Sequence, residues 1–386
     1  MRIGIDARLI NETGVGRYIR NLVRELGRQD KTNEYTVFLK KKEFGSFELP
    51  NPRWKKVLAE VGWHTLSEQV MMPWIMLRAR LDLVHIPYFN IPIFYPGRMV
   101  ATIHDLTILH FDTGKATTLP WVLYKLRRAG YRIALAVGLR RVKQIIAVSK
   151  TTKEEIIDHF HVQPEKIVVT YEGVDERVKS QSFDKAQDDP ERSRMGQKSK
   201  VKSQKRIIDT PYFLYVGNAY PHKNLETLLS AFQTYATHQA SSAQLVLVGK
   251  EDFFYRKIKK LVSSMNLDER ILFFGHADDW QLANLYAHAM AFVFPSLMEG
   301  FGLPALEALA LGCPVIVSDI PVFREILTNH AVYFNPHSSQ ELYEALRRAS
   351  ESNVPSSDRD GVKMFEMYSW SNLASDTLGV YRHASS

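Results

Sequence analysis

Glu299 and Glu307 are the two residues of this chain whose type and spacing most strongly suggest chemistry. They lie in the segment FVFPSLMEGFGLPALEALALGCPVIVSD, residues 292–319, where apolar runs stand on both sides of a glycine-containing stretch. The runs predict two strands, Pro304 suits the first turn of a helix between them, and Gly312 suits its end. We therefore expect Glu299 in a loop and Glu307 about one turn inside the helix. This order of elements places the loop at the carboxyl end of a parallel sheet, where open α/β sheets bind ligands.

Two glycines leave this loop open, so that backbone N–H groups at the helix start can face an anion. The two glutamates, with seven residues including G-F-G-L-P between them, closely resemble the paired-glutamate signature of the family-4 retaining glycosyltransferases, which have the two-domain GT-B fold. The resemblance implies that Glu307 binds the ribose hydroxyls of a nucleotide sugar and that Glu299 hydrogen-bonds the transferred sugar. It also implies backbone contacts to sugar and phosphate from Gly300, Phe301, Gly302 and Leu303. The alternative is a solvent-facing glutamate pair on an ordinary strand–helix unit.

A lysine near another strand end supplies a cation for a diphosphate leaving group. In YVGNAYPHKNLETLLSAF, residues 215–232, a strand ends at Gly217 and a loop carries His222 and Lys223 into a helix. An ammonium group beside a helix start can bind phosphate together with the backbone N–H groups, which stabilises the departing charge. The segment resembles the family's Gly–loop–Arg–Lys–Asn motif, which implies that His222 and Lys223 bind the diphosphate. His222 stands where Arg is usual, so it would act through a hydrogen bond. The alternative is a surface lysine at a helix cap.

Weaker signals occur at three other predicted strand ends. LVLVGK ends with Lys250, which resembles a residue that members of this family place near the nucleotide. ILFFGHADD carries Gly275 and His276 in a loop that resembles the family loop whose backbone recognises the base. Near the start, NETGVGRYIRNLVREL places Gly16 between a strand and a helix, but a third glycine is missing from the dinucleotide fingerprint. The resemblance instead implies a glycine loop over the diphosphate and acceptor. Four arginines then recur at helical spacing and suit either anionic lipid or a solvated face: Arg17, Arg20, Arg24 and Arg28.

His104 and Asp105 follow the apolar run VATI and are predicted at a strand end. A histidine can donate or accept a hydrogen bond near neutral pH. The dipeptide resembles the family motif on the acceptor side, which implies that His104 contacts the transferred sugar and that Asp105 lies close to it. The alternatives are a metal pair or a capping Asp beside a core His. YEGVDE carries Glu172 where the related turn has Asn, and we expect Glu172 to be structural.

The composition is that of a soluble globular chain: 386 residues, 45% hydrophobic and 24% charged. One cysteine, Cys313, excludes an internal disulfide. The start has no signal-peptide pattern, and no apolar run is long enough to span a membrane. The net charge of +8 is unevenly placed, because residues 1–175 contain 27 Lys and Arg against 18 Asp and Glu, whereas the remainder contains 23 against 24. A basic first half suits anionic lipid, nucleic acid or an acidic substrate.

Strand and helix patterns alternate through both halves, which predicts two Rossmann-like, doubly wound parallel sheets of the α/β class. We expect an acceptor-side domain over 1–175, a flexible polar linker or insertion over 176–209, and a donor domain over 210–369. The resemblance implies that helix 370–386 returns to the first domain. Predicted strands of the first half are Arg2–Asp6, Tyr35–Phe38, Leu83–His85, Met99–His104 and Gln144–Ser149, with helices Val15–Gly27 and Pro120–Arg141. Those of the second half are Tyr212–Val216, Leu245–Val248, Ile271–Phe274, Ala291–Pro295 and Pro314–Ser318, with helices Leu225–Ala236, Trp280–Ala289 and Ser371–Tyr381.

These features together predict a retaining hexosyltransferase that acts on a nucleotide diphosphate sugar in polysaccharide or glycolipid assembly. The resemblance favours mannose and GDP-mannose, and leaves UDP-sugars open. It requires no metal and no further cofactor. The acceptor would be a sugar or a lipid-linked sugar. The protein would be cytoplasmic, with peripheral association at the inner face of the cell membrane. The alternatives are an inactive GT-B scaffold, a sugar-nucleotide epimerase and, least favoured, a nucleic-acid-binding protein, because the basic linker contains one aromatic residue.

Overall fold

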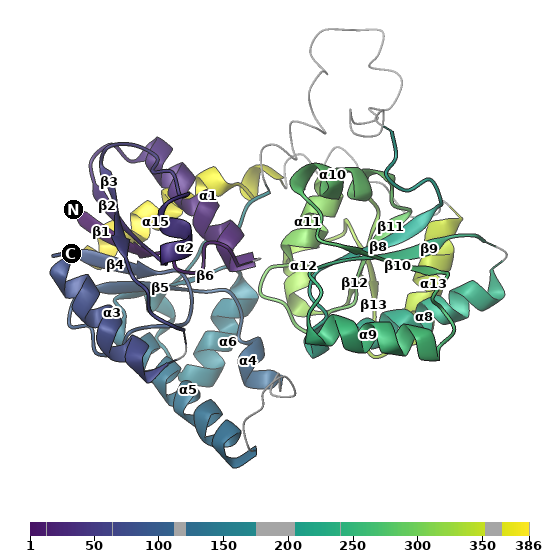
Figure 1. Cartoon of the computed structure of the whole chain (residues 1–386), viewed down its shortest axis with the longest axis horizontal. Helices are drawn as coiled ribbons and strands as arrows, with labels where there is room; N and C mark the ends of the chain where they lie inside the picture. The colour runs from purple at the N-terminus through teal and green to yellow at the C-terminus, as the bar shows by residue number, and fades with distance from the viewer. Residues whose placement is uncertain are drawn as a thin grey trace, which may run out of the picture. The chain divides into compact units, whose positions relative to one another are not determined.

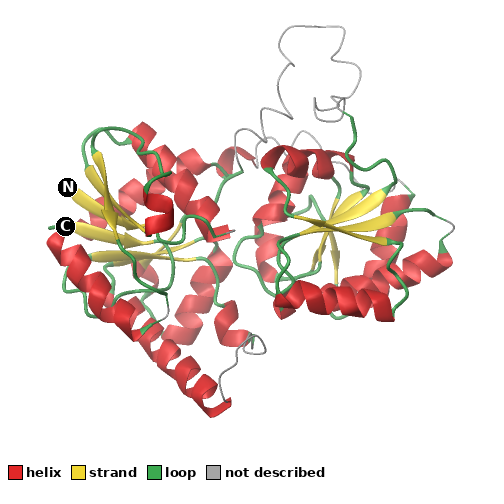
Figure 2. Cartoon of the chain, in the orientation of Figure 1, coloured by secondary structure: helices red, strands yellow, loops and turns green. Residues whose placement is uncertain are grey.

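The chain forms two compact α/β units. The computed structural model describes residues 1–12, 14–63, 65–111, 121–174, 205–239, 241–351 and 365–385, and the side chains of 121–128 are excluded from it. Unit 1 comprises Met1–His110, Thr117–Gly173 and Tyr368–Ser386, and unit 2 comprises Phe111–Ala116 and Val174–Met367. Figure 2 shows the strands of each sheet in yellow with red helices on both sides. The predicted fold class, two doubly wound parallel sheets, is confirmed.

Within the described residues, the sheet of unit 1 has the strand order β3-β2-β1-β4-β5-β6-β7, and every pairing is parallel (Figure 1). Its strands are β1 Arg2–Asp6, β2 Glu34–Leu39, β3 Trp54–Leu58, β4 Leu83–Ile86, β5 Met99–Ile103, β6 Gln144–Ala147 and β7 Ile167–Val169. Its helices are α1 Gly14–Gln29, α2 Lys41–Phe44, α3 Leu66–Arg78, α4 Thr107–His110, α5 Trp121–Arg141, α6 Lys150–Phe160 and α15 Trp370–Ser385. The central strands β4, β5 and β6 are buried along their whole length, since helices cover both faces of such a sheet.

The C-terminal helix α15 belongs to unit 1 and is held there by buried polar contacts. The Nδ1 atom of His85 lies 2.7 Å from the hydroxyl of Tyr381, and its Nε2 lies 2.8 Å from the hydroxyl of Thr102. Complete burial lowers the pKa of His85 to about 3, so the ring is neutral at ordinary pH. Trp370 packs at 6.4 Å from the ring of Tyr18 in α1. Helix α15 therefore completes the core of unit 1 although almost the whole of unit 2 precedes it in sequence.

The sheet of unit 2 has the order β10-β9-β8-β11-β12-β13 in the described residues, again with all pairings parallel. Its strands are β8 Tyr212–Val216, β9 Gln244–Val248, β10 Ile271–Gly275, β11 Ala291–Phe294, β12 Val315–Ser318 and β13 Val332–Phe334. Its helices are α8 Leu225–His238, α9 Phe253–Ser264, α10 Asp279–His288, α11 Leu303–Ala310, α12 Pro321–Leu327 and α13 Ser339–Ser350. Residues 176–204 of the predicted linker lie outside the described residues. The end of the linker is fixed, because Asn284 of α10 hydrogen-bonds the backbone of Lys205 and Ile207.

The predicted strands and helices are present, with ends that shift by up to a few residues. One shift concerns a predicted site. Helix α1 begins at Gly14, so Gly16 lies in its first turn and not in a loop before it. A Cβ atom at Gly16 would lie 2.5 Å from the carbonyl oxygen of Ile10, so only glycine lets the helix approach this backbone. Several elements had no prediction, among them β3, α3, β7 and β13.

Candidate active site

Each sheet reverses its strand order once, and predicted site residues of unit 2 lie in the loops beside its reversal. In unit 2 the reversal falls between the neighbouring strands β8 and β11. The loop after β8 carries His222 and Lys223, and the loop after β11 carries Glu299. Open α/β sheets bind ligands at the carboxyl ends of strands at such a switch point, because the loops diverge there. The topology therefore brings together residues that the sequence separates by more than seventy positions.

Lys223 and Glu299 form an ion pair at this switch point. The Nζ atom of Lys223 lies 2.5 Å from Oε1 of Glu299, and each side chain is 12% exposed. Ser296 donates a hydrogen bond of 2.7 Å to the same carboxylate oxygen. The ammonium group also lies 5.1 Å from the centre of the Phe294 ring. An ammonium has three N–H donors, so Lys223 can keep Glu299 and still bind a phosphate oxygen.

The two loops are joined by the residues next to this pair. The N–H group of Leu297 donates to the carbonyl oxygen of His222 at 2.7 Å. Asn224 adopts a left-handed conformation with φ of 56°, and its amide nitrogen donates to the carbonyl oxygens of Pro295 and Pro336 at 3.0 and 2.8 Å. Lys223 is thereby fixed at the end of a 3-10 turn, Pro221–Lys223, just before the start of α8. A fixed cation is useful in catalysis because it costs no reorganisation when charge develops.

Helix α11 begins where the glycine loop ends, as predicted. Gly302 has φ of 88°, and a Cβ atom there would lie 2.6 Å from the ring of Phe323. Pro304 is in the first turn, and Glu307 is the fifth residue of the helix. Glu307 is buried, with 4% of its surface exposed. A buried carboxylate must be hydrogen-bonded, and hydroxyls of a ligand are suitable donors to it.

Glycines end the three strands on one side of the switch point. Gly217, Gly249 and Gly275 follow or end β8, β9 and β10. A Cβ atom at Gly249 would lie 2.1 Å from the carbonyl oxygen of Gly217, so the strand ends are packed too closely for a side chain. Lys250 and His276 are exposed beside these glycines, at the carboxyl ends of the strands. All the predicted donor residues of unit 2 thus lie at the carboxyl end of its sheet.

His104 follows β5 in unit 1, and both of its ring nitrogens face oxygen acceptors. Nδ1 lies 2.9 Å from Oε1 of Glu172, and Nε2 lies 3.1 Å from the carbonyl oxygen of Pro87. The ring of Tyr18 packs edge-on at 4.8 Å. A neutral imidazole has one N–H donor and can satisfy one of these acceptors, whereas a cationic ring satisfies both. Glu172, which the sequence suggested only as a structural residue, therefore positions a candidate site residue.

Asp105 has a local structural contact. Its Oδ1 accepts hydrogen bonds from the backbone and the hydroxyl of Thr107 at the start of α4. This is the capping arrangement that the sequence left open as an alternative. Glu155 of α6 is a neighbour that the sequence analysis missed. Burial, Asp105 and Asp158 raise the pKa of Glu155 to about 7. No local pattern marks this residue, because its burial and the approach of Asp105 arise only in the fold.

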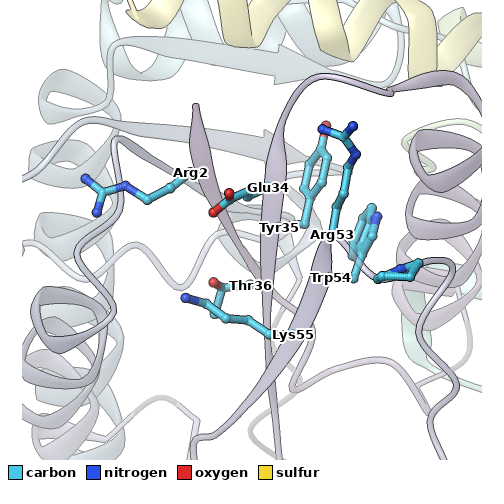
Figure 3. A pocket seen from close by; sticks show the side chains of 8 residues that line it. Arg2, Glu34, Tyr35, Thr36, Arg53, Trp54 and Lys55 are labelled. Atoms are coloured by element: carbon cyan, nitrogen blue, oxygen red, sulfur yellow. The ribbon is translucent and has the colours of Figure 1, made fainter.

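A separate pocket lies at the other end of the unit 1 sheet (Figure 3). Its lining includes Arg2, Glu34 and Arg53, at the amino ends of β1, β2 and β3. These strand ends are opposite to the carboxyl ends where the predicted site lies, so we do not assign the predicted ligand to this pocket.

In the described parts of the chain, no three His, Cys, Asp or Glu side chains come close enough to share a metal ion. Among the same residues, no helix has both the length and the apolarity that crossing a bilayer requires.

Comparison with known families agrees with this geometry. Residues 13–178 match Glycosyltransferase Family 4, and residues 197–361 match Glycosyl transferases group 1. The chain belongs to these glycosyltransferases. Two relatives of the glycosyltransferase are the O-antigen chain mannosyltransferase RfbU of Salmonella typhimurium and O-antigen chain mannosyltransferase B of Escherichia coli. RfbU is 28% identical over 75% of this chain and 70% of that protein, and mannosyltransferase B is 27% identical over 80% and 76%.

Solved structures share the fold of the glycosyltransferase. Sucrose-phosphate synthase from Thermosynechococcus elongatus has a TM-score of 0.75 at 19% identity and covers 99% of this chain and 98% of its own. Anabaena HepE in complex with UDP and glucose has a TM-score of 0.72 at 15% identity and covers 99% of both chains. The predicted GT-B fold is therefore confirmed. The family match confirms the predicted activity of glycosyl transfer from a nucleotide sugar.

Proposed function

We propose that this glycosyltransferase moves mannose from GDP-mannose to a hydroxyl of a sugar or lipid-linked acceptor, with retention of the anomeric configuration, in cell-surface polysaccharide assembly. The two O-antigen mannosyltransferases to which the chain is similar support the sugar and the pathway class. The observation that carries the site assignment is the Lys223–Glu299 pair at the switch point of unit 2. UDP-sugars are the second donor class, and a nucleotide panel distinguishes the two.

Each residue of the unit 2 site has a role in this proposal. The buried carboxylate of Glu307 accepts hydrogen bonds from the ribose hydroxyls. Lys223 and His222 bind the diphosphate, and the backbone from Gly300 to Leu303 contacts phosphate and sugar. Glu299, held by Lys223 and Ser296, accepts a hydrogen bond from a hydroxyl of the transferred sugar.

The reaction breaks the bond between the anomeric carbon and the diphosphate and forms a bond to the acceptor oxygen on the same face. The proton of the acceptor hydroxyl passes to the leaving phosphate. Lys223 stabilises the negative charge that develops on the diphosphate as it leaves, and this preferential stabilisation of the transition state lowers the barrier. His104 of unit 1 contacts the transferred sugar. Lys223 and the helix start supply the positive charge in this scheme, so we expect transfer to persist in EDTA.

Thermal stability with a panel of GDP-, UDP- and ADP-sugars, with and without EDTA, tests the donor site. A ligand that binds only the folded state raises the melting temperature. We expect GDP-mannose to raise it in wild type with or without EDTA, and the increase to be lost in Glu307→Ala. Glu226→Gln, at an exposed ion pair of unit 2 with Lys257, is the matched control and should behave as wild type.

Three outcomes would contradict the proposal. If only UDP-sugars raise the melting temperature, the donor is a UDP-sugar and not GDP-mannose. If no nucleotide raises it, the proposed site does not bind a donor. Binding of GDP-mannose without transfer to any acceptor in a membrane lipid extract would favour the inactive scaffold.

A further inference from the structure

Helix α3 of unit 1 is apolar on its solvent side. Residues Met72, Pro73 and Met76 are buried against the unit, yet the opposite side also presents large apolar side chains. Leu66 is 90% exposed, Val70 66% and Trp74 54%. A helix that is apolar on all sides is normally buried, and contiguous exposed apolar patches mark interaction sites.

The exposed residues of α3 form one stripe, and the loop after β4 lies against the same helix. Leu66, Val70, Trp74 and Leu77 follow helical spacing, so they share one side of α3. The side chain of Gln69 holds the loop after β4 against the helix, since it donates to the carbonyl oxygen of Ile91 and accepts from the N–H group of Ile93. Phe94 in this loop is 64% exposed. We call the combined patch the α3 surface, and its residues are Leu66, Val70, Met71, Trp74, Leu77 and Phe94.

The charge around the α3 surface has one sign. Only two carboxylates occur between Leu66 and His104: Glu68, which is buried and pairs with Arg8, and Asp82, which pairs with Arg2. Arg78 lies with its guanidinium 3.5 Å from the ring centre of Trp74. Helix α5 is tied to the same loop, since Arg141 donates to the carbonyl oxygen of Tyr95. From Ala129 to Arg141 this helix has no carboxylate and three exposed arginines: Arg132, Arg140 and Arg141.

We propose that the α3 surface docks on a bilayer that contains anionic lipid, which places the glycosyltransferase at the surface where a lipid-linked acceptor resides. The inference rests on the proposed lipid-linked acceptor of the preceding section. Apolar side chains enter the acyl boundary while arginines pair with lipid phosphates, and Trp beside Arg is suited to the interface between the two. A symmetric dimer through this patch would bring the arginines of both copies together without carboxylates to pair them, so a second copy fits less well.

Vesicle flotation of the full chain tests the α3 surface. The vesicles are phosphatidylcholine with and without phosphatidylglycerol, and the variant is Val70→Ser with Trp74→Ser. Both positions are exposed, so the fold should tolerate the change. We expect wild type to bind the anionic vesicles and the variant to bind at least about tenfold more weakly, because the lost apolar burial is not replaced. Phe253→Ser, 48% exposed on α9 of unit 2, is the matched control and should bind as wild type.

Raised salt should weaken binding by wild type without abolishing it, since it screens the arginines and leaves apolar burial intact. The proposal is overturned if wild type floats with neither vesicle, or if the variant floats as wild type does. It is also overturned if the variant changes only the oligomeric state in size-exclusion chromatography, which would identify a protein surface. The increase in melting temperature with GDP-mannose, measured on the same proteins, is independent of the α3 surface. Its absence would therefore count against the proposed donor and not against docking.

Discussion

The carboxylate of Glu172 lies 2.9 Å from Nδ1 of His104, although 68 residues separate the two in sequence. The other ring nitrogen faces the carbonyl oxygen of Pro87, so the ring is fixed from both sides. A carboxylate at this position sets the orientation of the ring. Glu172 thus connects the turn at the end of unit 1 with the residue proposed to contact the sugar.

Glu172→Ala should lower kcat by roughly 10- to 100-fold, the range expected when a hydrogen bond to a charged group is lost. Donor KM should stay within about twofold, because the proposed donor contacts lie mainly in unit 2. Glu172→Gln keeps an acceptor oxygen for the ring of His104, so its kcat should fall less than that of Glu172→Ala. Steady-state kinetics of the two variants measure kcat and donor KM. A kcat of Glu172→Ala equal to that of wild type would contradict the positioning role.

Lys223→Met should weaken binding of the nucleotide diphosphate sugar by roughly 10- to 100-fold, because a charge-assisted contact to phosphate is lost and Glu299 is left without its cation. Isothermal titration with the donor and with the free nucleoside diphosphate measures this. Lys257→Met removes a lysine of an exposed pair in the same unit and should leave donor affinity unchanged. Equal effects of the two substitutions would remove Lys223 from the site.

Gly302→Ala should destabilise unit 2 by roughly 1–3 kcal/mol, because φ of 88° is costly for alanine and the added Cβ meets the ring of Phe323. Urea unfolding measures the change. Gly379→Ala is the control, because this glycine lies inside α15 with open space around its missing Cβ. It should be neutral or stabilising by up to about 1 kcal/mol. Equal unfolding of the two variants would show that Gly302 is not strained.

Glu155 should make unit 1 less stable as pH rises through 7. Burial together with Asp105 and Asp158 raises its folded pKa to about 7 from the model-peptide value of 4.5. The folded state therefore binds the proton more tightly, and this contribution to stability is full below the unfolded pKa and lost as pH rises through the folded pKa. Glu155→Gln should raise the melting temperature at pH 8 relative to wild type, and this difference should shrink towards pH 5. A difference independent of pH would contradict the assignment.

The two parallel sheets and the residues at their strand ends can be predicted from the amino-acid sequence alone. Buried parallel strands are continuous apolar runs, as in VATI before His104, and the loop and helix around Glu299 and Glu307 are specified by nearby glycine and proline. Such signals are local, so they can be identified without a structure. Strand β3 was missed because WKKVL at the sheet edge has two lysines within it and lacks a continuous apolar run.

Which of these residues contact one another depends on how segments that are distant in sequence pack together. The pairing of Lys223 with Glu299 depends on β8 and β11 being neighbours, and that of His104 with Glu172 on the turn at the end of unit 1. The return of α15 to unit 1 rests on contacts such as His85 with Tyr381, which lie 296 residues apart. The exposure of Trp74 likewise could not be inferred, because the sequence pattern of an apolar helix does not show whether neighbouring elements cover one side of it or both. Periodicity reports which residues can be buried, whereas the packing of distant segments decides which of them are.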